Sequence, residues 1–185
     1  MNNKSCTVIS TYFGRRRTSP SGVHQTIEYL DEYFNKLAVL DSGVDSDIII
    51  VNHAYPNVPV DDEESLKFLS KFNGMKTING EVKVVNRGRE SGVGRSFKSF
   101  DYAFNLFKND YDYWFFVEDD VPIILPNYFK YSIKQLEDEQ ENNVAFICGY
   151  GDTNNGKHCH GGAGCTHKRF LEKIVEKYGH LSFCK

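Results

Sequence analysis

The feature that most constrains the fold of this chain is the alternation of short, β-rich apolar runs with amphipathic helical stretches. Strand-like runs are expected at residues 6–12, 47–51, 81–85, 113–117 and 143–148. Between them, apolar residues recur at helical spacing, as in the stretch that places Leu30, Phe34 and Leu37 on one face. Strands that alternate with helices favour an α/β fold, in which helices flank a largely parallel central sheet.

Composition narrows the class of protein further. At 185 residues the chain suits one domain of moderate size, and its net charge of −3 lacks the basic excess typical of nucleic-acid binding. No apolar run reaches the roughly 20 residues that a membrane span needs. The N-terminus lacks the apolar core of a secretory signal, so we expect a cytoplasmic protein whose five cysteines are reduced thiols.

Residues 113–121 combine an apolar run with three adjacent carboxylates at its end, Glu118, Asp119 and Asp120. Carboxylates held together repel one another, and each loses hydration on burial. A divalent cation offsets both costs, and hard cations prefer oxygen ligands of this kind. The same pattern also fits a solvated acidic turn, so the neighbouring segments must decide between the two interpretations.

Two segments rich in glycine and arginine follow other predicted strands. Residues 14–17 come just after the first strand, and residues 86–95 form a predicted loop that precedes a helix. Arginine binds phosphate oxygens through paired hydrogen bonds, and helix N-termini favour anions. Neither segment matches the Walker A or dinucleotide-binding motif, so they favour a nucleotide site of another type, with a solvated basic turn as the alternative.

Ligands of open α/β sheets bind beyond the carboxyl ends of the strands. That edge is expected to collect residues 11–17, 52–53, 86–95, 118–120 and 149–152. A divalent ion on the carboxylates could bridge to a diphosphate whose remaining charge meets arginine, and it would stabilise a departing nucleoside diphosphate. The combination of these segments therefore predicts a metal-dependent nucleotide site.

A glycine-rich segment at residues 160–165 precedes the last predicted helix, which is expected at about residues 166–178. Small residues let the backbone approach a ligand closely, although a tight turn entering the helix explains them equally well. The segment also lies within a group of possible zinc ligands, His158, Cys159, His160, Cys165 and His167. Their spacing matches none of the common zinc patterns, so a zinc module is the weaker interpretation.

Two segments resemble motifs of GT-A-type glycosyltransferases. The segment W-F-F-V-E-D-D-V-P-I-I-L-P-N-Y-F, at residues 114–129, resembles the E-D-D segment of the N-acetylglucosaminyltransferase I type. The segment H-G-G-A-G-C-T-H-K-R-F, at residues 160–170, resembles the G-G-A-G segment of Fringe-type and core-1 galactosyltransferases, and the two occur in the expected order. The resemblance implies one GT-A, Rossmann-like domain over residues 1–185. It also implies sugar transfer from a nucleoside diphosphate sugar, expected to be a uridine diphosphate sugar, to a hydroxyl of a glycan.

The resemblance also implies roles for individual residues. Asp120 would bind Mn²⁺ or Mg²⁺, with Glu118 and Asp119 beside the ribose or a metal-bound water. The nucleotide would be bordered by residues that follow strand ends: Thr11, Tyr12, Arg15, Asn52, Arg87 and Arg95. Gly161, Gly162 and Ala163 would line the donor sugar or the acceptor.

An inverting transferase needs a carboxylate that deprotonates the acceptor hydroxyl. In the resembled families this residue follows the G-G-A-G helix, but here only Glu172 and Glu176 follow Gly164, both within the last predicted helix. The favoured interpretation is that the base lies beyond residue 185 and the chain is the N-terminal part of a longer protein. Asp152, in the loop after the fifth predicted strand, is the candidate base within this chain. A retaining mechanism would need no such base. A catalytically silent nucleotide-sugar or carbohydrate-binding module and a sugar nucleotidyltransferase remain alternative functions.

Overall fold

The computed structural model describes residues 4–11, 27–54, 67–89, 95–148 and 163–181. In these residues one six-stranded sheet has the order β3-β2-β1-β4-β6-β5. The strands are β1 (Ser5–Thr11), β2 (Ser46–Ala54), β3 (Val82–Arg89), β4 (Tyr113–Glu118), β5 (Phe146–Cys148) and β6 (Ala163–His167). The first four are parallel, whereas β6 runs antiparallel to both β4 and β5. The expected α/β fold with a mostly parallel sheet is therefore confirmed.

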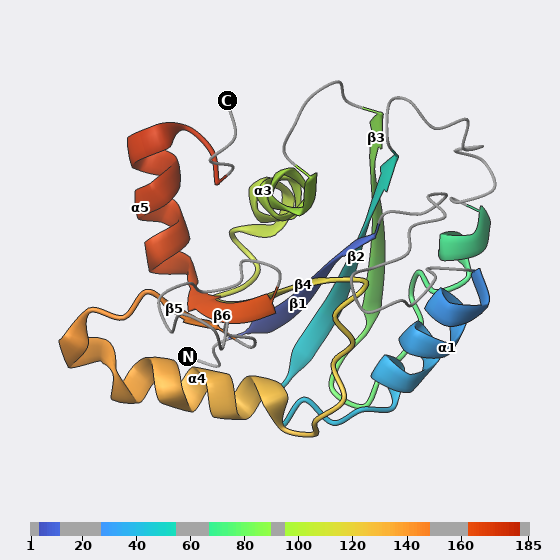
Figure 1. The fold of residues 1–185 in the computed structure, drawn as a ribbon, viewed down its shortest axis with the longest axis horizontal. Coiled ribbons are helices and arrows are strands. Elements are labelled where there is room, and N and C mark those ends of the chain that lie inside the picture. Colours follow the sequence, from blue (N-terminus) through green and yellow to red (C-terminus); the bar gives the residue numbers. More distant parts are fainter. Residues whose placement is uncertain (1–3, 12–26, 55–66, 90–94, 149–162, 182–185) are drawn as a thin grey trace, which may run out of the picture.

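Helices cover both faces of this sheet. They are α1 (Ile27–Ala38), α3 (Arg95–Phe107), α4 (Tyr128–Asp138) and α5 (Lys168–Tyr178), with a short 3₁₀ turn at Gln140–Asn142. Figure 1 shows α1 and α4 on one side of the sheet and α3 and α5 on the other. No helix in the described ranges is long and apolar enough to cross a membrane.

The apolar core of each layer follows from the alternation of side chains along the strands. In β4, Phe115 and Val117 pack in the layer of α1 and α4, while Trp114 and Phe116 pack against α3. Phe100 of α3 stacks on Phe116 with ring centroids 4.7 Å apart. A strand buried on both faces needs an unbroken apolar run, which explains why β4 was recognisable in the sequence.

Strand β3 differs from its prediction, because it continues through Asn86 to Arg89, where a loop was expected. Pairing with β2 persists across a register shift at Asn52/His53, beyond which His53 lies opposite Gly88. A bulge of this kind inserts an extra residue without ending the ladder. The loop prediction for residues 86–89 was therefore wrong, because the glycine- and arginine-rich sequence does not show that β2 continues to pair with these residues.

Strand β6 was also missed, because residues 163–165 were expected to form a glycine-rich turn and residues 166–167 the start of the last helix. They lie between β4 and β5, with Ala163 opposite Val117 and Gly164 opposite both Phe116 and Cys148. A Cβ on Gly164 would come within 2.3 Å of Phe146 Cε1, so the absence of a side chain is required by the neighbouring strand.

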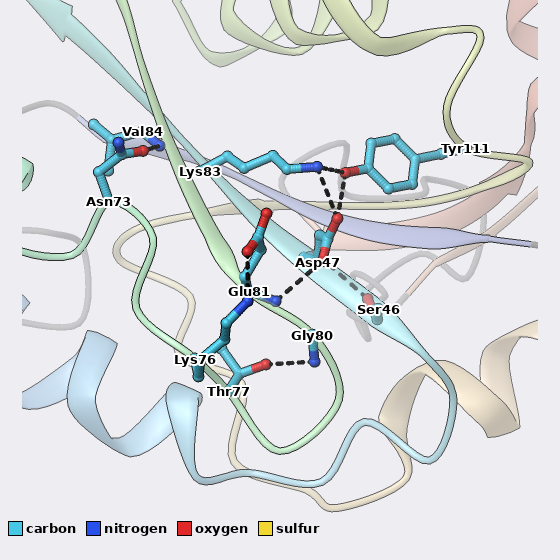
Figure 2. A network of polar contacts seen from close by, with 10 residues as sticks. All are labelled: Ser46, Asp47, Asn73, Lys76, Thr77, Gly80, Glu81, Lys83, Val84 and Tyr111. Carbon is cyan, nitrogen blue, oxygen red and sulfur yellow. Dashed lines mark hydrogen bonds and ion pairs between the residues drawn. The ribbon is translucent and has the colours of Figure 1, made fainter.

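At the amino ends of the strands, Asp47 is the centre of a closed polar network (Figure 2). Its Oδ2 accepts hydrogen bonds from Lys83 Nζ at 2.9 Å and from the Tyr111 hydroxyl at 2.6 Å, and its Oδ1 accepts from the Glu81 amide at 3.0 Å. Burial alone would raise the pKa of the Asp47 carboxyl, but these hydrogen bonds outweigh it and hold the pKa below its usual value. Both carboxylate oxygens are thus satisfied by the protein itself.

Candidate functional site at the carboxyl edge of the sheet

The carboxyl ends of the four parallel strands bring several predicted site residues into one row. Thr11 of β1 lies opposite Asn52 of β2, and Asn52 lies opposite Asn86 of β3. On the other side of β1, Ser10 lies opposite Glu118 of β4. Segments far apart in the sequence therefore meet at one edge, as the strand-end rule predicted.

Glu118, the last residue of β4, is hydrogen-bonded to α3. Its Oε1 accepts a short hydrogen bond from the hydroxyl of Ser96, in the first turn of α3. Ser96 is 1% exposed, whereas Glu118 is only partly buried. The Glu118 carboxylate thus lies on the α3 side of the sheet and is oriented by a partner that the sequence analysis did not identify.

Asp119 is fully buried and connects to the opposite layer. Its amide donates to the Ser10 carbonyl at 3.2 Å, and its carbonyl accepts from the Tyr29 hydroxyl of α1 at 3.3 Å. Burial raises the pKa of Tyr29, and the negative charges of Asp119 and Asp120 raise it further. Tyr29 therefore remains a neutral hydrogen-bond donor, and the charges of both carboxylates contribute to keeping it neutral.

Asp120 differs from its two neighbours. Its Oδ1 is buried, yet among the described residues no donor lies within hydrogen-bonding reach. An ionised carboxylate oxygen in this position loses hydration without compensation, which is costly unless a ligand supplies a positive charge or a donor. Of the three carboxylates in the turn, Asp120 is thus the one with a buried oxygen that has no hydrogen-bond partner among the described residues.

Two buried serine hydroxyls accompany the acidic turn. Ser10 of β1 and Ser99 of α3 are both 0% exposed, and neither Oγ has a hydrogen-bond partner in the part of the chain that the structure describes. Ser99 follows Ser96 by one helical turn, on the helix that covers β1. Unsatisfied polar atoms therefore occur on more than one element at this edge.

The three adjacent carboxylates do not form one ready-made ligand set. Within the described ranges, no group of three or more histidine, cysteine, aspartate or glutamate side chains lies close enough to hold a metal ion. The reason is local: Glu118 is held by α3, whereas the charge of Asp119 acts on Tyr29 of α1. Binding of Mn²⁺ or Mg²⁺ at this turn stays a prediction.

The predicted base-binding side of the edge is polar and partly buried. Asn52 is 1% exposed and donates from Nδ2 to Asn86 Oδ1 at 3.1 Å. The Thr11 hydroxyl donates to the Val51 carbonyl at 3.1 Å, so it is occupied within the sheet. Arg87, in β3, is 9% exposed. Asn86 was not singled out as a site residue, and only its register with Asn52 identifies it.

Of the other predicted site residues, only Ala163 and the backbone of Arg95 lie within the described residues. Ala163 is 4% exposed at the start of β6, next to the end of β4. Arg95 is the first residue of α3, although its side chain is outside the description. Five further predicted residues lie outside the described residues: Tyr12, Arg15, Asp152, Gly161 and Gly162.

The proposed zinc ligands are only partly within the described chain. His158, Cys159 and His160 lie outside it, whereas Cys165 is 0% exposed in the apolar core. Burial raises the pKa of the Cys165 thiol, so the neutral form is favoured over the thiolate that binds metals. His167 caps α5, where its Nδ1 accepts from the Arg169 amide at 3.1 Å. Both residues therefore have structural roles.

Comparison with known proteins gives similarity of fold alone. No family model matches the sequence, and no curated protein does. A 4-diphosphocytidyl-2C-methyl-D-erythritol synthase from Anaerococcus prevotii has a TM-score of 0.54 at 16% identity, and the match covers 95% of this chain and 75% of that one. A cytidylyltransferase from Leptospira borgpetersenii has a TM-score of 0.52 at 13% identity, covering 100% of this chain and 66% of that one.

A third solved structure, the apo form of mouse xyloside xylosyltransferase 1, has a TM-score of 0.38 at 8% identity and covers 97% of this chain and 77% of that one. That similarity is too low to carry an argument. The two stronger matches agree with the α/β architecture described above. The activity therefore has to be argued from the residues at the carboxyl edge.

Proposed function

We propose that this chain binds a nucleoside diphosphate sugar at the carboxyl edge of its sheet and transfers the sugar to a hydroxyl group. The observation that carries the proposal is the buried Oδ1 of Asp120, which has no hydrogen-bond partner among the described residues at the end of a central strand. Open α/β sheets bind their ligands at this edge. An oxygen left unsatisfied there suits a site completed by its ligand.

Asp120 is the residue of the turn that is best placed to bind a divalent cation. Asp120 would bind it directly, since an ionised carboxylate accepts only and its buried Oδ1 has no described donor to compete with the ion. Asp119 or Glu118 would lie beside it, and the remaining ligands would be water and diphosphate oxygens. When bound, such an ion would neutralise the charge that develops on the departing nucleoside diphosphate.

The polar row along the strand ends would hold the nucleotide. Asn52, with its amide paired to Asn86, offers hydrogen-bonding groups of both kinds to a base, and Thr11 lies beside it in register. Arg87 and Arg95 would meet the ribose and diphosphate, together with Arg15 and Tyr12 after β1. These residues bind and orient the donor.

For acceptor activation we retain Asp152 as the proposed base that would take the proton of the attacking hydroxyl. Gly161, Gly162 and Ala163 would lie along the donor sugar or the acceptor. Replacement of Asp152 by asparagine in the full chain should leave nucleotide binding unchanged and reduce transfer by about 100-fold or more, which is the usual contribution of a general base.

A sugar nucleotidyltransferase is the second candidate function. The observation in its favour is the fold shared with a 4-diphosphocytidyl-2C-methyl-D-erythritol synthase and a cytidylyltransferase, at TM-scores of 0.54 and 0.52. The two reactions differ in their leaving group: a nucleotidyltransferase releases pyrophosphate from a nucleoside triphosphate, whereas a glycosyltransferase releases a nucleoside diphosphate. We favour the glycosyltransferase because the acidic triplet and the G-G-A-G segment occur in the order of that family.

The proposal is tested by thermal unfolding with a panel of nucleoside diphosphates and triphosphates, each with and without Mn²⁺. A ligand at 100 times its dissociation constant stabilises the folded state by about 2.7 kcal/mol, which shifts the melting temperature by several degrees. We expect a diphosphate, UDP in the first place, to stabilise only when Mn²⁺ is present. The variant Asp120→Asn should lose the response to Mn²⁺.

Asp110→Asn is the matched control, because Asp110 is an exposed aspartate just before β4, at the opposite end of that strand. It should keep the full response. If no nucleotide stabilises the wild-type chain, the proposed function is wrong. Stabilisation by CTP with pyrophosphate release would favour the nucleotidyltransferase, and diphosphate binding without any release of sugar would favour a silent binding module.

A further inference from the structure

A hollow with a volume of about 570 Å³ lies directly beside the acidic turn. It is formed by three parts of the chain: the connection between β4 and α4, the first turns of α4, and the neighbouring ends of β4 and β6. Its lining residues are Phe115, Val117, Val121, Pro122, Ile123, Ile124, Leu125, Pro126, Asn127, Tyr128, Tyr131, Ser132 and Ala163. We call it the β4–α4 hollow; in Figure 1, α4 lies in the same layer as α1.

Several of the polar groups around the hollow are used within the protein. The Ser132 hydroxyl donates to the Tyr128 carbonyl at 2.8 Å, and the Tyr128 hydroxyl is hydrogen-bonded to Thr7 Oγ1 at 2.7 Å. The Asn127 amide donates to the Asp41 carbonyl at 2.7 Å. None of the described lining residues is charged. The hollow therefore offers mainly apolar surface to a ligand.

Three lining side chains are exposed to a degree that core packing does not explain. Ile124 is 75% exposed, Leu125 68% and Tyr131 64%. A large apolar side chain that stays in water forgoes about 1.5–3 kcal/mol of burial free energy. Three such side chains around one hollow therefore favour a binding surface. A stable homodimer needs about 800 Å² from each partner, and three such side chains expose roughly half of that. A small ligand is the better occupant.

The hollow lies next to the acidic turn at which the proposed reaction would take place. Val117 immediately precedes Glu118, and Val121 immediately follows Asp120, so residues on both sides of the acidic turn line the hollow. Ala163, opposite Val117 in the sheet, lines it as well. A molecule in the hollow would thus lie next to the acidic turn.

We propose that the β4–α4 hollow binds an aromatic group of the acceptor, placing the attached hydroxyl at the acidic turn. Aromatic and proline rings supply flat walls for such a group, namely Phe115, Tyr128, Tyr131, Pro122 and Pro126. A cavity of about 150 Å³ accommodates benzene, so the hollow has room for a fused or substituted ring system. The inference rests on the proposed function, and it narrows the acceptor to a molecule with an aromatic aglycone.

The test uses 2-naphthol as the aromatic probe and n-octanol as the alkyl probe, with binding to the full chain measured by isothermal titration calorimetry. We expect 2-naphthol to bind at least about tenfold more tightly than n-octanol. Ile124→Ser should weaken 2-naphthol binding by about threefold to tenfold, because an exposed apolar contact is lost. Ile78→Ser is the matched control, since Ile78 is 59% exposed and does not line the hollow, and it should have no effect.

A second variant, Ser132→Leu, fills the hollow from α4 and should abolish binding of the probe. If this variant does not fold, the double variant Ile124→Ser, Leu125→Ser replaces it, because both positions are exposed. Equal or tighter binding of n-octanol, or binding of 2-naphthol that neither hollow variant changes, overturns the proposal. So does a wild-type dimer that Leu125→Ser converts to a monomer without any binding of 2-naphthol, which would make the hollow a protein interface.

The nucleotide experiment separates this inference from the proposed function. Ile124→Ser should keep the full Mn²⁺-dependent nucleotide stabilisation, because Ile124 contacts the acceptor only. Normal nucleotide stabilisation without binding of 2-naphthol would defeat the inference alone. Binding of 2-naphthol without any nucleotide response would defeat the proposed function, and with it the assignment of the hollow to an acceptor.

Discussion

Partly buried carboxylates differ in their surroundings at the two ends of the parallel strands. At the amino ends, Asp47 accepts hydrogen bonds from Lys83, Tyr111 and the Glu81 amide, which satisfy both of its oxygens. At the carboxyl ends, Asp120 Oδ1 is buried without a partner in the described chain. The first end stabilises the fold by itself, whereas the second leaves polar groups that a ligand would satisfy. The difference supports the carboxyl edge as the proposed ligand site without reference to any motif.

The largest effect is expected from removing the centre of the amino-end network. Asp47→Ala leaves Lys83 and Tyr111 without their acceptor, so it should lower the free energy of unfolding by about 2–4 kcal/mol, as measured by urea denaturation. Asp31→Ala is the control, because the Asp31–Lys71 ion pair is exposed, and it should cost no more than about 1 kcal/mol. Equal losses in the two variants would mean that the network has no special role.

The acid dependence of stability should also reflect Asp47. Because its pKa is lowered in the folded state, its contribution is present above the unfolded pKa of about 3.9 and is lost as pH falls through the folded value. The stability difference between wild type and Asp47→Asn should therefore be largest near pH 7 and narrow below about pH 4. Urea denaturation at a series of pH values measures it. A difference that does not change with pH would contradict the hydrogen-bonded, ionised state of Asp47.

The opposite sign is expected at the carboxyl end. Asp120→Asn replaces a partly exposed carboxylate whose buried Oδ1 has no hydrogen-bond partner among the described residues. Without metal the change should leave the free energy of unfolding unchanged or raise it by up to about 1 kcal/mol. Asp110→Asn, at an exposed position, provides the baseline. A loss of more than about 1 kcal/mol relative to this baseline would show that Asp120 has a structural partner and would remove the contrast between the two ends.

The smallest effect is expected at Ser10. Its buried hydroxyl has no hydrogen-bond partner in the described residues, so Ser10→Ala should change the free energy of unfolding by no more than about 0.5 kcal/mol. Thr7→Val is the comparison within the same strand, because it removes the hydrogen bond to Tyr128 and should cost about 1 kcal/mol. Chemical denaturation of both variants in one buffer gives the comparison directly. A larger loss for Ser10→Ala than for Thr7→Val would contradict it.

The layers of the fold were predictable because they depend on local sequence patterns. The apolar run of β4 and the helical spacing of Phe100 and Phe104 in α3 indicate their elements without knowledge of any partner. By contrast, β6 and the end of β3 depend on pairing with strands elsewhere in the chain. Glycine and arginine at residues 87–89 look like a loop until β2 supplies hydrogen bonds. Residues 163–167 look like a turn leading into a helix until β4 and β5 pair with them.

For the candidate site, the sequence predicted which residue types lie at the strand ends, but it did not predict which side chains contact one another. The sequence places Glu118, Asp119 and Asp120 at a strand end. Which of these carboxylates is hydrogen-bonded depends on the face of the sheet to which each side chain points and on the position of α3 over the sheet. The Ser96–Glu118 hydrogen bond joins residues 22 positions apart, and no spacing rule indicates it. The β4–α4 hollow is likewise invisible in the sequence, where residues 121–126 read as an ordinary apolar connection.

The way in which β3 ends the sheet has a consequence for aggregation. An edge strand with free amides and carbonyls is a template for another chain. Here the Val84 amide donates to Asn73 Oδ1 at 2.9 Å (Figure 2), and Val82 exchanges hydrogen bonds of 2.8 and 2.9 Å with Gly74 and Met75. The first half of this edge is thus already occupied by the chain's own backbone and side chains. A second molecule would have to displace residues 73–75 before it could add a strand there.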